Sequence, residues 1–247
     1  MDRKLIVEYR DVSYSIGGRT ILDRFNLQIA AGETLVLLGR SGSGKTTALK
    51  MVNGLLFPTS GQVLVHGKPT TEWDPIRLRR GIGYVIQDVG LFPHYTVRQN
   101  VELVPKLENW DQPRIDARVA ELLERVGLNA ADYGGRYPRQ LSGGQRQRVG
   151  VARALAVGPE LLLFDEPFGA LDPVTRLELQ KQFVALRQSF DTASVFVTHD
   201  VREALSLGTR IGLLQEGRLV QLDTPAEFRH STNPEARAFL ACLEEVA

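Results

Sequence analysis

The sequence has few cysteines, no long apolar run and little net charge, and each shortage narrows the class of protein. Cys242 is the only cysteine among 247 residues, so no disulfide can form within the chain, and a reducing compartment fits. No segment reaches the ~20 consecutive apolar residues of a membrane-spanning helix, and the N-terminus lacks the apolar core of a signal peptide. The net charge of +1 gives no electrostatic reason to expect nucleic acid as a partner. We therefore expect a cytoplasmic chain.

A glycine-rich loop is the strongest local signal. Residues 39–46 match the phosphate-binding pattern G-x-x-x-x-G-K-[ST], after an apolar run at 35–38 and before a predicted helix at 46–52. Its glycines let backbone N–H groups converge on phosphates, Lys45 adds a positive charge, and Thr46 offers a hydroxyl to Mg²⁺. The predicted phosphate-binding residues are Gly39, Arg40, Ser41, Gly42, Ser43, Gly44, Lys45, Thr46 and Thr47. The pattern predicts a site for a nucleoside triphosphate.

Two acidic residues follow a second apolar run, at 161–164. Such strand tips are where α/β sheets hold ligands, and paired acids there need a cation or water beside them. Asp165 fits as the carboxylate on the Mg²⁺ side, and Glu166 fits as the residue that polarises the attacking water. His199 follows the apolar strand pattern at 194–198 and is expected at the same edge, within reach of the γ-phosphate.

A second glycine-rich element at 141–145 begins another predicted helix, with Ser142 as its N-cap. Exposed N–H groups at a helix start attract anions, yet one phosphate group needs only one cradle. The residues predicted to face a nucleotide here are Ser142, Gly143, Gly144 and Gln145. Because this element belongs to a different subdomain from the first loop, a two-fold dimer in which each chain covers the other's nucleotide satisfies the geometry.

The predicted fold class is α/β, a P-loop NTPase core with an N-terminal antiparallel β subdomain and an inserted α-helical subdomain. Ile115, Val119, Leu122 and Leu123 have the spacing of an amphipathic helix, and Gly127 is its expected C-cap. We expect one domain over residues 1–247. Residues 1–87 and 146–230 would form the β subdomain and the P-loop core, 88–145 the helical subdomain, and 231–247 a C-terminal helix.

Together these motifs resemble the ATP-binding cassette (ABC) family over roughly residues 5–230. The resemblance implies that Tyr14 stacks on adenine and that Gln87, at a strand end, contacts Mg²⁺ or the water and moves with the helical insert. It also implies that Asp172, in the stretch 170–172, crosses the dimer interface, and that His199 is the switch histidine. The implied catalytic residues are Glu166, His199, Gln87 and Lys45, and the implied Mg²⁺ ligands are Thr46, Gln87 and Asp165.

Within the family, residues 51–55, 83–87, 91–94 and 100–107 are similar to the ATPases of importers for quaternary amines such as glycine betaine and choline. The resemblance implies an ATP- and Mg²⁺-dependent motor at the cytoplasmic face of the membrane. Its expected partners are a second copy of itself, integral membrane permease subunits and, indirectly, a substrate-binding protein, with no nucleic acid. Many ATPases of this group carry C-terminal regulatory domains; none is expected within this sequence.

Other readings stay open at this stage. The solute could instead be an amino acid or a sulfonate. An ABC protein that acts on DNA would carry long heptad repeats between the two glycine elements, and residues 48–140 show none. A ribosomal one would carry two sets of motifs, and this sequence has one. A regulatory module that binds nucleotide without catalysis is disfavoured by Glu166 and His199.

Overall fold

The structure is a computed structural model, which describes residues 4–87, 89–169, 171–188 and 192–244. It divides into two compact units, one formed by Met1–Arg79 with Asp191–Ala247 and the other by Arg80–Phe190. We call them unit 1 and unit 2. Unit 2 contains the strands β6 and β7 and the helix α7 besides the predicted helical insert. The subdomain boundaries expected at 87/88 and 145/146 stay a prediction.

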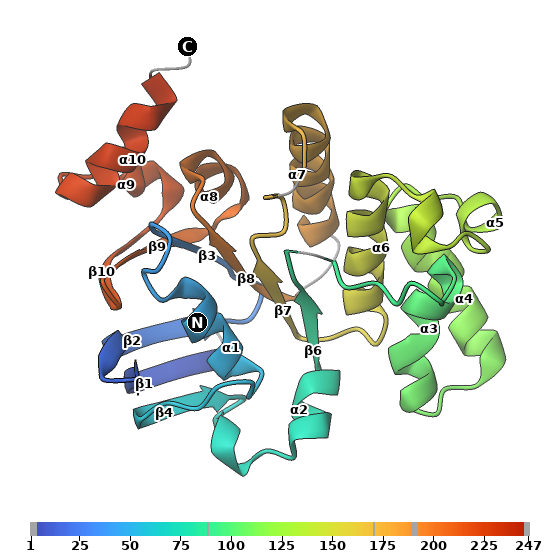
Figure 1. The fold of residues 1–247 in the computed structure, drawn as a ribbon, viewed down its shortest axis with the longest axis horizontal. Helices are drawn as coiled ribbons and strands as arrows, with labels where there is room; N and C mark the ends of the chain where they lie inside the picture. Colours follow the sequence, from blue (N-terminus) through green and yellow to red (C-terminus); the bar gives the residue numbers. More distant parts are fainter. Residues whose placement is uncertain (1–3, 88, 170, 189–191, 245–247) are drawn as a thin grey trace. The chain divides into compact units, whose positions relative to one another are not determined.

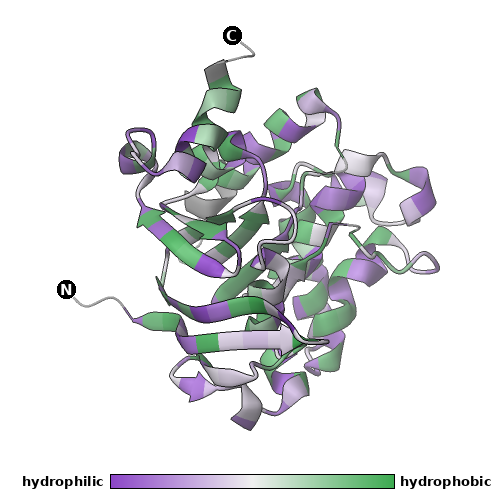
Figure 2. Ribbon diagram, turned by 60° about the vertical axis from the view of Figure 1, so that its left-hand side comes forward, coloured by the Kyte–Doolittle hydropathy of each residue, from purple (hydrophilic) through white to green (hydrophobic). Residues whose placement is uncertain are grey.

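Unit 1 contains an antiparallel sheet in the order β2-β1-β4-β5, whose first three strands are seen side by side in Figure 1. Its strands are β1 Leu5–Ile16, β2 Arg19–Ala30, β4 Ser60–Val65 and β5 Lys68–Pro69. Along β2, Phe25, Leu27 and Ile29 are buried, whereas Asn26 and Gln28 are exposed. This alternation, visible as colour bands along the long strands in Figure 2, is typical of a sheet with one face in the core.

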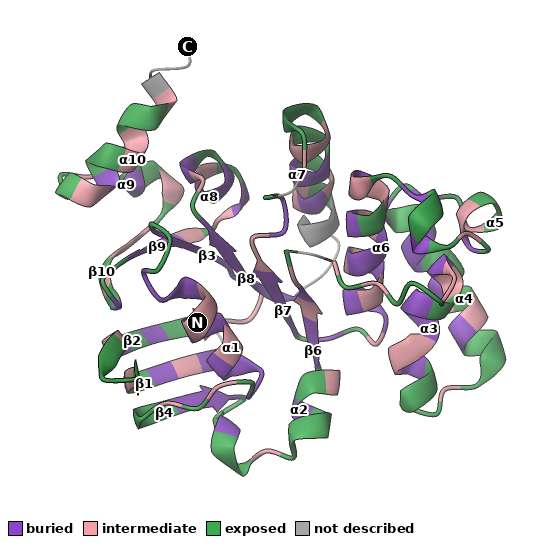
Figure 3. Cartoon of the chain, viewed as in Figure 1, coloured by how far each residue is buried: buried purple, intermediate pink, exposed green. Residues whose placement is uncertain are grey.

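The core of unit 1 is a second set of strands in the order β10-β9-β3-β8. These are β3 Thr34–Leu38, β8 Ala193–Thr198, β9 Arg210–Gln215 and β10 Arg218–Asp223. β3 runs parallel to both neighbours, and β3 and β8 are buried along their whole length (Figure 3). The apolar run at 35–38 therefore forms a central parallel strand, as its composition predicts.

The helices of unit 1 pack on its strands and on one another. They are α1 Lys45–Val52, α8 Val201–Leu207, α9 Pro225–Phe228 and α10 Pro234–Glu244, with the 3₁₀ turn η1 Thr70–Glu72. The helix α2 Pro75–Arg80 contains the boundary between the two units. The expected C-terminal helix is α10, and residues 245–247 lie outside the described part.

Unit 2 combines a pair of parallel strands with a helical cluster. The strands are β6 Ile82–Val85 and β7 Leu161–Asp165. The helices are α3 Val97–Leu107, α4 Gln112–Arg125, α5 Ala130–Tyr133, α6 Gly143–Leu155 and α7 Pro173–Gln188, with the 3₁₀ turn η2 Pro138–Gln140. α3, α4 and α6 pack on one another (Figure 1).

The amphipathic pattern predicted at 115–126 is confirmed by α4. Ile115, Val119, Leu122 and Leu123 are all buried, Asp111 caps the start by accepting from the Arg114 amide, and Gly127 follows the end with φ +71°. A positive φ at this position is what a glycine after a helix provides at little cost. In the part of the chain that the structure describes, every helix is too short or too polar to span a bilayer.

Tyr9 joins the antiparallel sheet to α1. Its buried hydroxyl donates to the Ala48 carbonyl oxygen at 2.9 Å, and its ring meets Phe25 edge to face with centroids 5.0 Å apart. Burial raises the pKa of Tyr9, which keeps the hydroxyl protonated and able to donate.

We expect Tyr9→Phe to lower the free energy of unfolding by about 1 kcal/mol, because it removes a buried hydrogen bond and keeps the ring contact. Urea unfolding of the variant measures the change. Tyr137→Phe, which alters an exposed ring, is the matched control and is expected to leave the unfolding midpoint in place. Equal midpoints for wild type and Tyr9→Phe would show that this bond contributes nothing.

Candidate functional site

The glycine loop of unit 1 connects β3 to α1. β3 ends at Leu38, and α1 begins at Lys45, whose side chain is buried although it is charged. The Lys45 ammonium group donates to the carbonyl oxygens of Gly39 and Arg40, at 2.8 Å each. Gly42 and Gly44 adopt φ +79° and +102°, a region that side chains disfavour. The loop thus has the strand–loop–helix setting of a phosphate cradle.

Gly39 is required for steric reasons. A Cβ atom there would lie 2.4 Å from the Leu214 carbonyl oxygen and 2.7 Å from Ser43 Oγ. Both contacts are far inside van der Waals distance, and the first is to backbone of β9, which cannot move away cheaply. β9 therefore supports the start of the loop.

A cleft of about 480 Å³ opens over this loop. Its wall is mostly polar, and it is lined by Arg19, Thr20, Ile21, Arg40, Ser41, Gly42, Ser43, Leu214, Gln215, Glu216, Gly217 and Glu235. Among these described lining residues, four belong to the predicted phosphate-binding set, and Tyr14 and His199 are not present. Tyr14 is half-buried on β1, opposite Leu22 of β2. Its stacking on adenine stays a prediction.

His199 lies at the same sheet edge as the glycine loop. β3 and β8 are parallel with Leu38 opposite Thr198, so Gly39 and His199 are the next residues on two neighbouring strands. His199 is exposed, whereas Thr198 is buried and donates to Glu203 Oε2 at 2.6 Å. The structure thus places the predicted switch histidine beside the predicted phosphate site, as the parallel arrangement requires.

In unit 2, Asp165 is the last residue of β7 and Glu166 follows it. Glu166 has φ +46°, a left-handed conformation that a non-glycine residue adopts at a cost of order 1–3 kcal/mol. The Gly169 amide donates to the Glu166 carbonyl oxygen at 3.1 Å, which closes the turn. Backbone strain of this kind persists only where the surrounding structure maintains it, and it is concentrated at functional sites.

Gln87 and Glu166 converge on Gly169. A Cβ atom at Gly169 would lie 3.4 Å from Gln87 Nε2 and 3.8 Å from Glu166 Oε2, so both side chains end beside this glycine. Tyr84 on β6 donates to Asp165 Oδ2 at 3.4 Å, and burial and this carboxylate raise the pKa of Tyr84. The predicted catalytic glutamate and the predicted Gln87 are therefore neighbours in unit 2, and Tyr84 is a contact that sequence reasoning missed.

The second glycine element starts α6 with a capping box. Ser142 Oγ accepts from the Gln145 amide at 3.2 Å, and the Gln145 side chain accepts from the Ser142 amide at 2.9 Å. A Cβ atom at Gly144 would lie 2.5 Å from Thr175 Cγ2 on α7. Gly144 is thus needed for helix packing, a role that the anion-binding interpretation of the motif did not include.

Asp172 caps α7, since its Oδ1 accepts from the Thr175 amide at 3.0 Å. Hydrogen bonds from Thr175 lower the pKa of this carboxyl group, so it stays ionised at neutral pH. Ala170, the first residue of the predicted interface stretch, lies outside the described residues.

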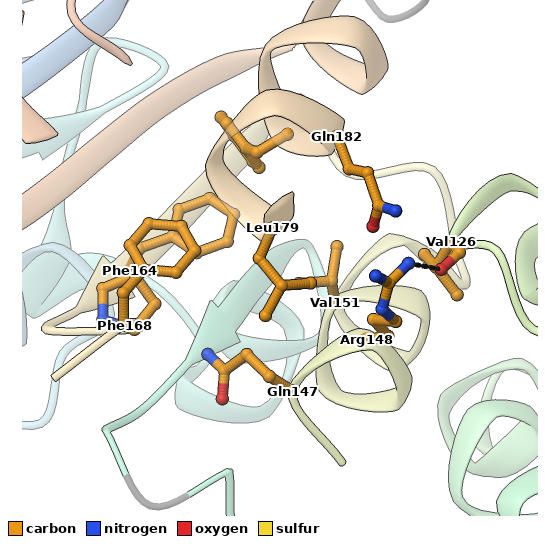
Figure 4. Close-up of a pocket in the computed structure, with 10 residues that line it drawn as sticks. Val126, Gln147, Arg148, Val151, Phe164, Phe168, Leu179 and Gln182 are labelled. Atoms are coloured by element: carbon orange, nitrogen blue, oxygen red, sulfur yellow. Dashed lines mark hydrogen bonds between the residues drawn. The ribbon is translucent and has the colours of Figure 1, made fainter. Parts of the chain in front are cut away.

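A separate pocket of unit 2 differs in chemistry. Its wall is formed by apolar side chains such as Phe164, Phe168 and Leu179 (Figure 4). Arg148 reaches the pocket, but its guanidinium group donates to the Val126 carbonyl oxygen at 2.9 Å, and burial lowers the pKa of Arg148. With so few polar groups available, this pocket does not suit a polyphosphate.

The residues proposed for Mg²⁺ are compatible with that ion. Thr46 offers a hydroxyl in unit 1, and Asp165 and Gln87 offer a carboxylate and an amide oxygen in unit 2, all hard oxygen donors of the kind Mg²⁺ prefers. The described residues contain no cluster of three or more His, Cys, Asp or Glu that could hold a metal ion. An ion held by one or two protein groups together with phosphate oxygens needs no such cluster.

Fold and loop define the class as a P-loop nucleotide-binding protein with a core of parallel strands. A family model described as ABC transporter matches residues 22–169. The chain belongs to the ABC transporter family.

Two related proteins are similar to this chain over most of its length. The chain is 48% identical to the glycine betaine/carnitine/choline transport ATP-binding protein OpuCA of Bacillus subtilis, over 91% of this chain and 59% of that protein. It is 48% identical to the osmoprotectant import ATP-binding protein OsmV of Salmonella typhimurium, over 83% of this chain and 54% of that protein. The chain thus spans little more than half the length of these relatives.

A solved structure has the same fold. The dimeric ATP-binding cassette MJ0796, in a post-hydrolysis state bound to ADP and Pi, matches with a TM-score of 0.78 and 34% sequence identity. The match covers 89% of this chain and 99% of that one. The predicted fold class is confirmed.

Gly39→Ala is expected to abolish nucleotide binding, because the added methyl group forces the loop away from Leu214 and Ser43. Titration with a fluorescent ADP analogue measures the affinity. Gly135→Ala is the control, since nothing lies within 4 Å of a Cβ atom there, and it should bind like wild type. Undiminished binding by Gly39→Ala would mean that the loop does not hold the nucleotide in this conformation.

Proposed function

We propose that this chain is the ATP-hydrolysing subunit of an ABC importer for quaternary amine osmoprotectants. The observation that carries the proposal is the loop of unit 1, which places a buried lysine and a row of glycines at the end of a central parallel strand, in a chain of this family. The names of the relatives OpuCA and OsmV point to transport and to the class of solute.

In the first step, the loop binds the triphosphate. Backbone N–H groups of residues 41–46 and the start of α1 meet the phosphate oxygens, and Lys45 exchanges its bonds to Gly39 and Arg40 for bonds to the β- and γ-phosphates. Lys45 suits this exchange because a charged phosphate oxygen is a stronger acceptor than a neutral carbonyl oxygen. Mg²⁺, when bound, would neutralise charge on these phosphates, held by Thr46, Asp165 and Gln87.

In the second step, two copies close on each other. The N-terminus of α6, capped by Ser142 and Gln145, presents the amides of Gly143 and Gly144 to the γ-phosphate held by the other copy. The dimeric ADP- and Pi-bound relative supports this arrangement. ATP then acts as a ligand that favours the closed state, and its hydrolysis removes that preference.

In the third step, Glu166 polarises a water molecule that attacks the γ-phosphorus. Glu166 has a left-handed backbone, and its carboxylate and the Gln87 amide both end beside Gly169. His199, next to the loop at the sheet edge, holds the γ-phosphate and the water in line. The proton of the water passes to Glu166, and the bond to the β–γ bridging oxygen breaks.

The proposed contact with the membrane permease is the loop before α3. Phe92, His94 and Tyr95 form a cluster in which each ring touches the other two, with centroids 4.5–6.1 Å apart. The buried side chain of Asn100 holds this loop in place. Its Oδ1 accepts from the backbone N–H of Phe92, and its Nδ2 donates to the backbone carbonyl oxygens of Phe92, Tyr95 and Thr96. A rigid, partly exposed aromatic surface suits a short helix from a permease subunit, and such a subunit would place the chain at the cytoplasmic face of the membrane.

Glu166→Gln is expected to lower the ATPase rate by about 100-fold or more, because it removes the group that accepts the proton. With hydrolysis blocked, ATP-Mg²⁺ should convert the variant from monomer to dimer, measured by light scattering after gel filtration. Adding Ser142→Arg should abolish the dimer, since the side chain fills the space of the γ-phosphate.

The control for loss of a helix cap is Thr96→Arg, in the same Glu166→Gln background. Thr96 caps α3 through a similar capping box but lies outside the second glycine element, so dimer formation should persist. An ATPase rate unchanged in Glu166→Gln would remove Glu166 from its role. A dimer insensitive to Ser142→Arg would contradict the proposed closure.

A further inference from the structure

An ion pair connects the glycine loop to the C-terminal helix. Arg40, the second residue of the loop, donates from Nε to Glu235 Oε1 at 2.6 Å and from Nη2 to Oε2 at 3.2 Å. Both carboxylate oxygens are engaged, so the pair has the bidentate geometry that gives arginine–carboxylate contacts their strength. The partners are 195 positions apart in the sequence, and no motif links them.

Glu235 is the fixed partner of this pair. The side chain of Asn233 accepts from the Glu235 amide at 2.9 Å, which caps the start of α10. Ser231 accepts from the Asn233 amide at 3.1 Å and donates to Gln221 on β10 at 2.8 Å. The carboxylate is thus anchored to the core strands of unit 1, and its side chain is only 13% exposed.

Arg40 is the exposed partner. Its side chain is 70% exposed, and Glu235 holds its guanidinium group. Its backbone is part of the phosphate cradle, because the Arg40 carbonyl oxygen accepts from Lys45 Nζ. Residues 40 and 235 line the same cleft as Ser41, Gly42 and Ser43, so the ion pair lies on the wall of the proposed nucleotide site.

We propose that Glu235 sets the nucleotide affinity of this site by holding Arg40 away from the phosphates. The inference rests on the proposed function, because it assigns the ligand of the cleft to a nucleoside polyphosphate. With Glu235 neutral, the guanidinium group is free to turn towards the phosphates and bind them. Without Arg40, the carboxylate is left unpaired on the wall and repels them. The two partners therefore act on affinity with opposite signs.

Opposite signs separate this role from a structural one. A clasp that only kept the loop in shape would lose nucleotide affinity when either partner is removed. An electrostatic role also depends on the charge of the ligand, so its effect should be larger for ADP than for AMP. It should shrink in about 0.5 M salt, where the Debye length falls to roughly 4–5 Å.

The test measures ADP and AMP affinities of wild type, Glu235→Gln, Arg40→Gln and the double variant by isothermal titration calorimetry. ADP avoids both hydrolysis and ATP-driven closure. We expect Glu235→Gln to bind ADP about three- to tenfold more tightly, Arg40→Gln to bind it weaker by a similar factor, and the double variant to lie near wild type. Thermal unfolding confirms that each variant is folded.

Glu8→Gln is the matched control. Arg10 Nη2 and Glu8 Oε2 are also 2.6 Å apart, with side chains 58% and 17% exposed, but this pair is on β1 and does not line the cleft. Its removal should leave ADP affinity unchanged. Weaker ADP binding by both Glu235→Gln and Arg40→Gln, or unchanged binding by both, would overturn the inference. The proposed function would still stand in that case, provided that the wild type binds ADP. Wild type that binds no ADP would overturn both.

Discussion

Burial of β3 between two parallel neighbours is the constraint on which the rest of unit 1 depends. A strand with no exposed face satisfies its backbone groups only through β8 and β9, and their shared direction brings the carboxyl ends of β3 and β8 to one edge. At that edge, Gly39 lies against Leu214 of β9 and has no room for a side chain. The positions of the phosphate cradle and of His199 follow from this packing.

The two glycine motifs are needed both for steric clearance and for hydrogen bonding. In the first loop, Gly42 and Gly44 provide backbone conformations and Gly39 provides clearance. In the second element, Gly144 allows α6 to approach α7, while Ser142 and Gln145 cap the helix. A substitution in either motif would therefore disturb packing as well as ligand binding, and activity by itself does not separate the two effects.

The cleft over the first loop carries charges of both signs. Arg19 and Arg40 attract a polyphosphate, whereas Glu216 and Glu235 oppose it. A motor that must release its product gains from a binding site of moderate affinity, since a ligand held too firmly would delay the reset. In the role proposed for it, the Arg40–Glu235 pair moderates the affinity of the site without altering the cradle.

Local patterns in the sequence were sufficient for many of the elements and for the fold class. Three such patterns are the apolar run before the loop, the spacing within α4 and the position of Ser142. Each depends on interactions between residues a few positions apart, which can be inferred from the sequence alone. The ends of predicted strands pointed to Glu166 and His199, and the family likeness added Gln87; the roles of all three remain proposals. Only the tertiary structure revealed the Arg40–Glu235 pair, the contact of Gly144 with α7, the Tyr84–Asp165 bond and the left-handed backbone of Glu166. Most of these are contacts between residues far apart in the sequence, and the strain at Glu166 needs the surrounding fold to maintain it, so no local pattern could encode them.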